Sequence, residues 1–319
     1  MAAPYKPGRF LILHQESTPK LGTELRVQVL EIFEPLTLSC VMRVWLDEDG
    51  QDPVEAVLKL FDRHFATQLR EDQKIDPWSA QHESAYLESI RTGQVNEFLN
   101  KLRGEEEDYQ EPPEGWSVAE NEAYLHDMCI DMFEAETAVY SKLESYQGTS
   151  IPKLIAKVTV DIAPSHTYQP SSDDADLLHV SGILIESIPG TTLSELGNSG
   201  IPRSCWQSIV DRAVGSIRIL SDHNILNEDV RPANVVVAQD SQAEDGYRIF
   251  MIDFAQCRFR EEESDFDWGR AKWAEDEEGA LGVVTRGRLA RYHGFDLAYQ
   301  DPGWYRQWAR KEGENTKWA

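Results

Sequence analysis

Runs in which apolar and polar residues alternate extend from Leu25 to Phe61 and predict β-strands. The runs are LRVQVLEIF, CVMRVWL and VEAVLKLF, and the stretches EPLTLS and DEDGQDP separate them. Alternating, β-branched segments bounded by Pro, Gly and Asp are typical of strands joined by turns. We therefore expect three antiparallel strands here, with Lys59 inside the third, between Leu58 and Leu60.

Residues 66–116 differ from these strands, because they contain few branched apolar residues and many charged ones. The segments SAQHESAYLESIR and QVNEFLNKLR predict two short helices. The charge-rich stretch at 104–115 indicates a solvated acidic loop. We interpret 66–116 as an insertion in the strand-rich part of the chain.

A long helix is predicted over residues 117–147. Ser117 and Glu120 have the spacing of a capping box, and Gly148 supplies a stop signal. An apolar stripe recurs at steps of three or four residues and consists of Leu125, Cys129, Met132, Val139 and Leu143. Glu136 falls within this stripe, so its carboxylate is expected on the buried face. A buried carboxylate requires a partner, because an unpaired buried charge is strongly destabilising.

The second half of the chain places polar residues next to apolar runs. In NEDVRPANVVV, the residues Asp229, Arg231 and Asn234 precede an apolar run, and in FMIDFAQC Asp253 follows one. Buried strands favour apolar neighbours, so these polar residues indicate loops that carry chemistry. Before these two stretches, the sequence predicts strands at IPKLIAKVTVDI and HVSGILIESIPG and a helix at SCWQSIVDRAVGSIRILSDHN.

Length and composition are those of a globular chain with two lobes or domains, since it has 319 residues and 41% hydrophobic content. No apolar stretch approaches the roughly 18 residues of a membrane span, and MAAPYKPGRF lacks the core of a secretory signal. We therefore expect a cytoplasmic protein without a membrane partner. The four cysteines form no CxxC pair and the eight histidines no HExxH motif, so neither a disulfide framework nor a zinc site is indicated.

The net charge of −25 changes the range of expected partners. A strongly acidic protein repels phosphate groups, so a nucleic-acid partner is not expected. If the charge has a functional role, it favours a neutral or cationic small-molecule substrate. The sequence leaves the oligomeric state open.

The order of the polar candidates resembles that of the protein kinase-like superfamily. The chain contains, in this order, a lysine in a third strand (Lys59) and a glutamate on a later helix (Glu136). They are followed by an aspartate five residues before an asparagine (Asp229 and Asn234) and by an aspartate at the end of a strand (Asp253). The phrases NEDVRPAN and IDFAQCRFR are similar to those of uncharacterised fungal kinase-like proteins. The stretch GILIESIPGTTLSEL resembles the hinge of aminoglycoside and choline phosphotransferases.

The resemblance covers roughly residues 25–300 and implies a two-lobed, kinase-like α+β fold. An N-lobe with an antiparallel sheet would span 1–184, a hinge 185–188, and a mainly helical C-lobe 189–319. The implied function is ATP- and Mg²⁺-dependent phosphorylation of a hydroxyl group on a small molecule. No APE-like segment follows Asp253, which makes a protein substrate less favoured.

The resemblance also implies a role for each candidate residue. Asp229 would accept the proton of the attacking hydroxyl, and Asn234 and Asp253 would bind Mg²⁺ through oxygen. Lys59 would hold the nucleotide phosphates, and Glu136 would hold Lys59. The remaining nucleotide contacts would come from the backbone near Glu186 and Ile188 and from a hydroxyl of Thr37 or Ser39.

Three departures from the family pattern keep other functions open. Asn227 and Glu228 stand where a histidine is usual before the catalytic aspartate. Ala255, the third residue of the triplet that begins at Asp253, stands where the family has glycine. The turn EPLTLS contains no glycine that would let the backbone wrap closely around phosphates. One alternative is a pseudokinase or nucleotide-binding interaction module whose partner surface is the acidic insertion. Another is an enzyme that uses the same site for nucleotidyl transfer or for transfer of another group.

Overall fold

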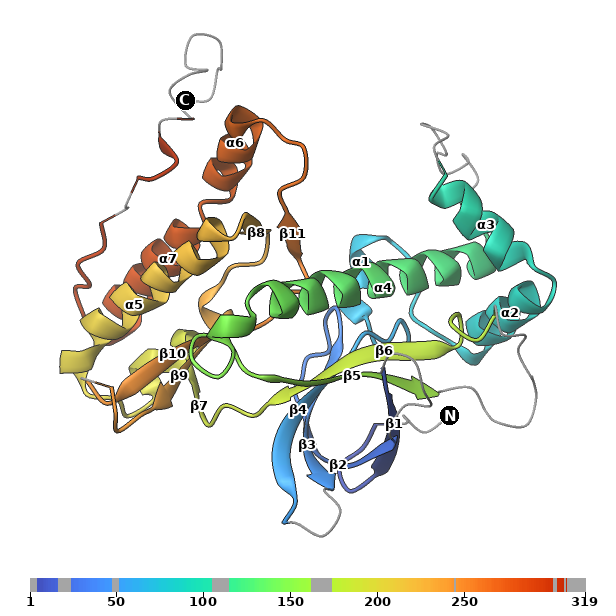
Figure 1. Ribbon diagram of the computed structural model, residues 1–319, viewed down its shortest axis with the longest axis horizontal. Coiled ribbons are helices and arrows are strands. Elements are labelled where there is room, and N and C mark those ends of the chain that lie inside the picture. The colour runs from blue at the N-terminus through green and yellow to red at the C-terminus, as the bar shows by residue number, and fades with distance from the viewer. Residues whose placement is uncertain are drawn as a thin grey trace. The chain divides into compact units, whose positions relative to one another are not determined.

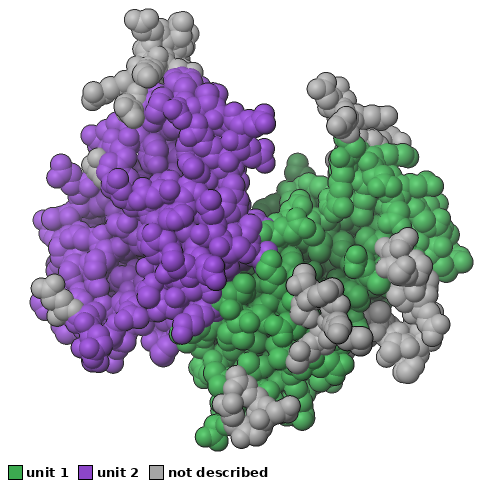
Figure 2. Space-filling model, in the orientation of Figure 1, with its two compact units in different colours: residues 1–134, 154–187 green, residues 135–153, 188–319 purple. Residues whose placement is uncertain are grey.

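The computed structural model describes residues 5–16, 24–47, 52–104, 115–161, 174–243, 245–300, 303–306 and 308 (Figure 1). Most of the predicted acidic loop at 104–115 lies outside these ranges. The chain divides into two compact units, which Figure 2 colours separately. Unit 1 consists of residues 1–134 and 154–187, and unit 2 of residues 135–153 and 188–319.

Unit 1 is built on a closed barrel of six antiparallel strands (Figure 1). Their order around the barrel is β1-β2-β3-β4-β6-β5. The barrel closes where β1 pairs with β5, with His14 opposite Thr159 and Gln15 opposite Val158. The strands are β1 Phe10–Gln15, β2 Glu24–Ile32, β3 Cys40–Asp47, β4 Val54–Leu60, β5 Leu154–Asp161 and β6 His179–Glu186.

The closed barrel overturns the predicted kinase-like fold. The three strands expected between Leu25 and Phe61 are confirmed as β2, β3 and β4. The sheet is not that of a kinase N-lobe, however, because β1 pairs with β2 on one side and with β5 on the other. Closure of this kind satisfies both sheet edges with backbone hydrogen bonds. The chain is therefore an α+β protein in which small sheets and helices follow a closed barrel.

Alternation along the strands fills the barrel with apolar side chains. Val27 and Val29 of β2, Met42 and Val44 of β3 and Leu58 of β4 are all fully buried in one cluster. Side chains on alternate positions of a strand point to opposite faces, so the intervening residues face outward. The sequence pattern alone therefore fixes which face of β2, β3 and β4 forms the core.

Gly182 of β6 is required by the close approach of β4. A Cβ atom at this position would lie 2.5 Å from the carbonyl oxygen of Lys59, and Leu60 is the pairing partner of Gly182. We expect Gly182→Ala to destabilise the protein by about 1–3 kcal/mol, because backbone atoms must shift to admit the methyl group. Urea unfolding measures this change.

Gly215→Ala is the matched control for that substitution. Gly215 lies in an exposed part of helix α5 (Arg203–Asp222), where an added Cβ meets nothing within 4 Å. There the substitution is expected to stabilise by about 0.5–1 kcal/mol, since alanine is the better helix former. Equal effects of the two substitutions would contradict the packing assigned to Gly182.

The predicted insertion at 66–116 forms helices in unit 1. The expected helices at 79–91 and 94–103 are confirmed as α2 and α3. They pack through Tyr86, Ile90 and Phe98 in a second apolar cluster. The helices that begin in unit 1 are α1 Thr67–Asp72, α2 Ala80–Arg91, α3 Gln94–Leu102 and α4 Val118–Lys142.

Helix α4 starts as the sequence predicts. The backbone N–H of Ser117 donates to the Glu120 carboxylate at 2.8 Å, and the backbone N–H of Glu120 donates to the Ser117 hydroxyl at 3.3 Å. This reciprocal pair is the expected capping box. The helix ends at Lys142, and a short 3₁₀ turn, Glu144–Tyr146, follows it.

Unit 2 contains two small antiparallel sheets and three longer helices among its described residues. One sheet has the order β10-β9-β7, and the other pairs β11 with β8. None of the helices in the described ranges of either unit is long and apolar enough to cross a membrane. The unit 2 elements after α4 are β7 Gly190–Thr192, η2 Leu193–Asn198, α5, β8 Ile225–Asn227, η3 Pro232–Asn234, β9 Val235–Gln239, β10 Tyr247–Met251, β11 Cys257–Phe259, α6 Asp265–Glu275 and α7 Glu277–His293.

Candidate active site

The segment between β8 and β9 carries two of the predicted site residues within unit 2. Asp229 lies just after β8, and the short 3₁₀ turn η3 ends at Asn234, where β9 begins. Strands β9 and β10 are antiparallel, with Val235 opposite Met251. The backbone N–H of Ile252 donates to the carbonyl of Asn234 at 3.0 Å. Because Asp253 follows Ile252, this hydrogen bond brings the backbone of Asp253 close to that of Asn234.

Asp229 and Asn234 are joined directly. The side-chain amide of Asn234 donates through Nδ2 to the carbonyl oxygen of Asp229 at 3.0 Å and to its Oδ2 at 3.1 Å. Arg231 lies 3.1 Å from the same Oδ2. Because Nδ2 is turned towards Asp229, Oδ1 of Asn234 is turned away from it, and the Arg231 Nε contact with Oδ1 is a long one at 3.4 Å.

Asp253 has an unusual backbone conformation. Its φ is +66°, in the left-handed region that residues other than glycine rarely adopt, although Asp and Asn do so more readily than most. The next residue, Phe254, is fully buried and contacts Tyr140 edge to face, with ring centroids 5.7 Å apart. The packing of Phe254 thus fixes the backbone that presents Asp253. Backbone strain of this kind is often found at functional sites.

A buried ion pair anchors the segment that leads to Asp229. Lys272 donates to the Glu277 carboxylate and, at 2.8 Å, to the carbonyl of Ile225. Glu277 accepts the backbone N–H of Asn227 at 2.9 Å, and the side chain of Asn227 accepts the backbone N–H of Asp229, also at 2.9 Å. A continuous series of hydrogen bonds therefore runs from Lys272 to Asp229.

Burial of this ion pair shifts the pKa of Glu277. The side chains of Lys272 and Glu277 are 0% and 1% exposed. Burial raises the pKa of Glu277, and the charge of Lys272 offsets only part of that effect. The charge of Lys272 therefore favours the ionised form of Glu277, against the effect of burial. Neither residue stands out in the sequence as buried, because AKWAEDEEGAL has the high charge content of an exposed segment.

Lys59 and Glu136 are both buried, with 5% and 1% of their surfaces exposed. The burial of Glu136 confirms its predicted place on the inward face of α4. Lys59 belongs to unit 1, where its ammonium lies 5.2 Å from the centre of the Phe61 ring. Glu136 belongs to unit 2. The ion pair between Lys59 and Glu136 stays a prediction.

The other predicted nucleotide contacts fall on loops and a strand end. Thr37 and Ser39 lie between β2 and β3, where Ser39 is buried and the Thr37 carbonyl accepts the backbone N–H of Gln68 at 3.1 Å. Glu186 is the last residue of β6 and pairs with Ala56. Ile188, half-buried, is the first residue of the second segment of unit 2. The roles assigned to Thr37, Ser39, Glu186 and Ile188 stay predictions.

Comparison of the sequence with protein-family models and with curated proteins finds no match. Within the ranges that the structure describes, no group of three or more His, Cys, Asp and Glu side chains is arranged to hold a metal ion. The site is therefore defined by its own geometry. The structure joins the Asp229 carboxylate to the Asn234 amide and ties the backbone of Asn234 to that of Ile252, the residue before Asp253, all within unit 2.

Proposed function

We propose that the chain is an ATP- and Mg²⁺-dependent phosphotransferase that acts on a hydroxyl group of a small molecule. The observation that carries this proposal is the direct contact between Asp229 and Asn234, together with the backbone bond that ties Asn234 to the residue before Asp253. Phosphoryl transfer depends mainly on positioning and charge neutralisation, and a fixed set of oxygen donors serves both.

The donor set fits Mg²⁺. Magnesium binds oxygen, keeps several waters, and is usually held by one or two carboxylates together with the phosphates of the substrate. Oδ1 of Asn234 and the carboxylate of Asp253 are donors of this type, and the Nδ2 bonds to Asp229 orient the amide. When bound, Mg²⁺ would neutralise charge on the phosphate oxygens.

Asp229 is the group that would accept the proton of the substrate hydroxyl. Its carboxylate is 23% exposed, so a substrate can reach it. Arg231 and Asn234 both bond to Oδ2, which fixes the rotation of the carboxylate. A base held in one orientation can act as soon as a hydroxyl is bound beside it.

The acceptor is proposed to be neutral or cationic, since the chain carries a net charge of −25. We place this activity in the cytoplasm. Magnesium-dependent ATP binding without transfer to any hydroxyl compound would instead favour a nucleotide-binding interaction module.

Asp253→Asn tests the metal site. Asparagine adopts a positive φ about as readily as aspartate, so this substitution removes the charge and leaves the backbone preference unchanged. We expect Mg²⁺-dependent ATP binding, measured by isothermal titration calorimetry, to weaken by a factor of ten or more, because one of the two proposed metal ligands loses its charge.

Asp276→Asn is the matched control. Asp276 also has a positive φ, of +46°, at the junction of α6 and α7. It has no part in the proposed site, so ATP affinity should not change. If Asp253→Asn binds ATP and Mg²⁺ as tightly as the wild type, the metal role of Asp253 is wrong.

A further inference from the structure

Unit 1 contains a buried cluster of charged side chains that has no part in the proposed activity. It begins directly after β4 at the sequence DRH, residues 62–64, and connects to α1, α2 and α4. Charged groups are rarely buried unless they are paired. The cluster consists of Asp62, Arg63, His64, Arg70, Glu83 and Glu122.

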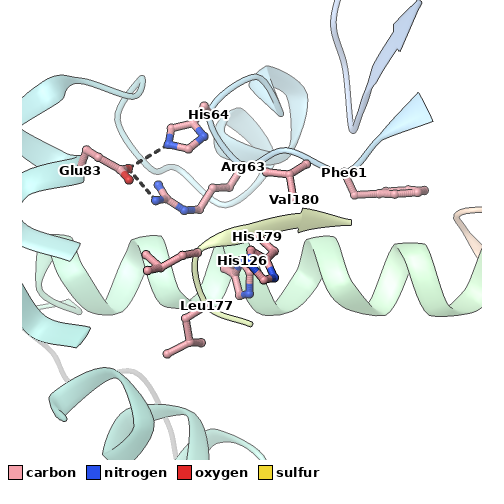
Figure 3. A pocket seen from close by; sticks show the side chains of 9 residues that line it. Phe61, Arg63, His64, Glu83, His126, Leu177, His179 and Val180 are labelled. Atoms are coloured by element: carbon pink, nitrogen blue, oxygen red, sulfur yellow. Dashed lines mark hydrogen bonds and ion pairs between the residues drawn. The ribbon is translucent and has the colours of Figure 1, made fainter. Parts of the chain in front are cut away.

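His64 bridges two carboxylates, those of Asp62 and Glu83, and Figure 3 shows its contact with Glu83. Its Nδ1 lies 2.5 Å from Oδ1 of Asp62, and its Nε2 lies 2.9 Å from Oε2 of Glu83. An ionised carboxylate only accepts hydrogen bonds, so both ring nitrogens must carry a proton to make both bonds. The geometry is therefore that of a positively charged imidazolium.

The charges of these six side chains balance when His64 is protonated. Arg63 donates to Glu83 at 2.6 Å and to Glu122 at 2.5 Å, and Arg70 donates to both oxygens of Glu122 at 2.9 and 2.8 Å. Two arginines and one imidazolium then face three carboxylates. With a neutral His64 the cluster holds one uncompensated negative charge at a buried position.

Other titratable groups face the same region from each neighbouring element. From the N-terminal segment, Tyr5 donates to Asp62 at 2.8 Å, and from α2, His82 lies 3.7 Å from Glu122. From β6, His179 lines the pocket and lies 3.0 Å from Asp161. From α4, His126 lines the pocket, and burial, with the charges of Arg63 and Arg103, lowers its pKa to about 3. His126 is thus neutral and cannot replace the charge of His64.

The pocket beside His64 is too small for a metabolite. Its volume is about 20 Å³, enough for a water molecule, and Arg63, His64, Glu83, His126 and His179 supply its polar lining (Figure 3). A water molecule in this space would exchange protons with the His64 ring. The binding event that this site supports is protonation of the His64 ring.

We propose that His64 is a proton-dependent latch that holds helix α2 of the insertion to the segment after β4, through its two bonds to Asp62 and Glu83. Loss of the proton removes one of the two bonds and leaves the excess negative charge beside Glu83. Helix α2 then opens more often. Arg63 still bonds Glu83, so deprotonation loosens α2 and does not release it completely.

The pKa shifts of the three groups set the pH range of the latch. Burial lowers the pKa of His64, but the hydrogen bonds to Asp62 and Glu83 outweigh it, so this pKa is raised above 6.5. Burial acts to raise the pKa of Glu83, but His64 and Arg63 outweigh it and lower this pKa to about 2. The pKa of Asp62 is likewise lowered, because His64 outweighs burial.

The sign of the pH dependence follows from these directions. A raised histidine pKa stabilises the closed state fully below about pH 6.5, and this contribution is lost as pH rises through the raised value. On the acid side, the pKa of Glu83 is lowered, so its contribution is complete above the ordinary value of about 4.5 and is lost as pH falls through about 2. The latch is therefore strongest between about pH 4.5 and 6.5 and weakens on either side of that range.

Two measurements on the full chain test the latch. NMR titration of the His64 ring should give a pKa above 6.5. Hydrogen exchange at the α2 amides, corrected for the intrinsic rate, should show an opening constant that rises about tenfold per pH unit between 6.5 and that pKa. Above the pKa the opening constant should level off.

His64→Gln should abolish this pH dependence, because glutamine does not titrate. His179→Gln is the control, since His179 lines the same pocket but pairs with Asp161 of the barrel, and it should keep the wild-type slope. A wild-type His64 that titrates at or below 6.5 overturns the latch even if His64→Gln fails to fold. The same pH slope in His64→Gln and wild type also overturns it.

Discussion

Asp229→Asn is expected to lower phosphotransfer by about 10²-fold or more while ATP binding stays nearly intact. Loss of a general base typically costs about 10²–10⁴-fold in rate, because the proton of the hydroxyl then has no acceptor in the transition state. Asn234 also bonds to the backbone carbonyl of Asp229, so that part of the loop geometry survives the substitution. Single-turnover kinetics with a hydroxyl acceptor and calorimetry with ATP separate the two effects.

Arg231→Gln distinguishes loss of the base from loss of its ion pair. Arg231 is 50% exposed and bonds Oδ2 of Asp229, so its removal takes away one of two contacts on that oxygen and leaves both the base and its Asn234 contact in place. We expect a much smaller fall in kcat than in Asp229→Asn. Equal losses in the two variants would show that Asp229 acts through the ion pair. Unchanged turnover in Asp229→Asn would remove its role as a base.

Local patterns in the sequence predicted individual elements of the fold better than their assembly. The alternation of apolar and polar residues identified β2, β3 and β4, and the apolar stripe of the long helix correctly predicted that Glu136 is buried. Strand β1, with the short sequence FLILHQ, was not recognised, and its partner β5 lies far along the chain. Barrel closure depends on this non-local pairing, which periodicity within a segment does not report. The wrong fold class came from the order of the polar candidate residues along the chain, which does not determine how the strands pair.

The candidate site was likewise predictable only in part. The spacing of Asp229, Asn234 and Asp253 was visible in the sequence, and the backbone pairing of β9 with β10 brings the last two near each other. The positive φ of Asp253 could not be predicted, because it is imposed by the packing around it. Lys272 and Glu277 were missed for a related reason. Their burial depends on the polar backbone of β8, which comes from a distant part of the sequence.

The same reasoning applies to the cluster around His64. Asp62, Arg63 and His64 directly follow a strand, a position where charged residues usually mark an exposed turn. Their partners Glu83 and Glu122 come from two separate helices. Buried charge networks depend on tertiary contacts, so the residue types alone do not distinguish them from a solvated surface.

Lys272→Met is expected to destabilise unit 2 by about 3–5 kcal/mol, the usual cost of leaving one member of a buried ion pair without its partner. Methionine fills most of the space of the lysine side chain, so the cost comes chiefly from the charge of Glu277 and from the lost bond to the Ile225 carbonyl. Urea unfolding followed by tryptophan fluorescence, to which Trp268 beside Lys272 contributes, measures the change in the free energy of unfolding.

Two further variants and the pH dependence identify the origin of this effect. Lys272→Met combined with Glu277→Gln should recover much of the stability, because glutamine carries no charge and its side-chain oxygen still accepts the Asn227 N–H. Arg218→Met breaks an exposed ion pair on α5, and it should cost no more than about 1 kcal/mol. In Lys272→Met the pKa of Glu277 rises further, so the deficit should shrink as pH falls and Glu277 takes up a proton. A deficit that is independent of pH and no larger than that of Arg218→Met would mean that the Lys272–Glu277 pair does not hold the segment leading to Asp229.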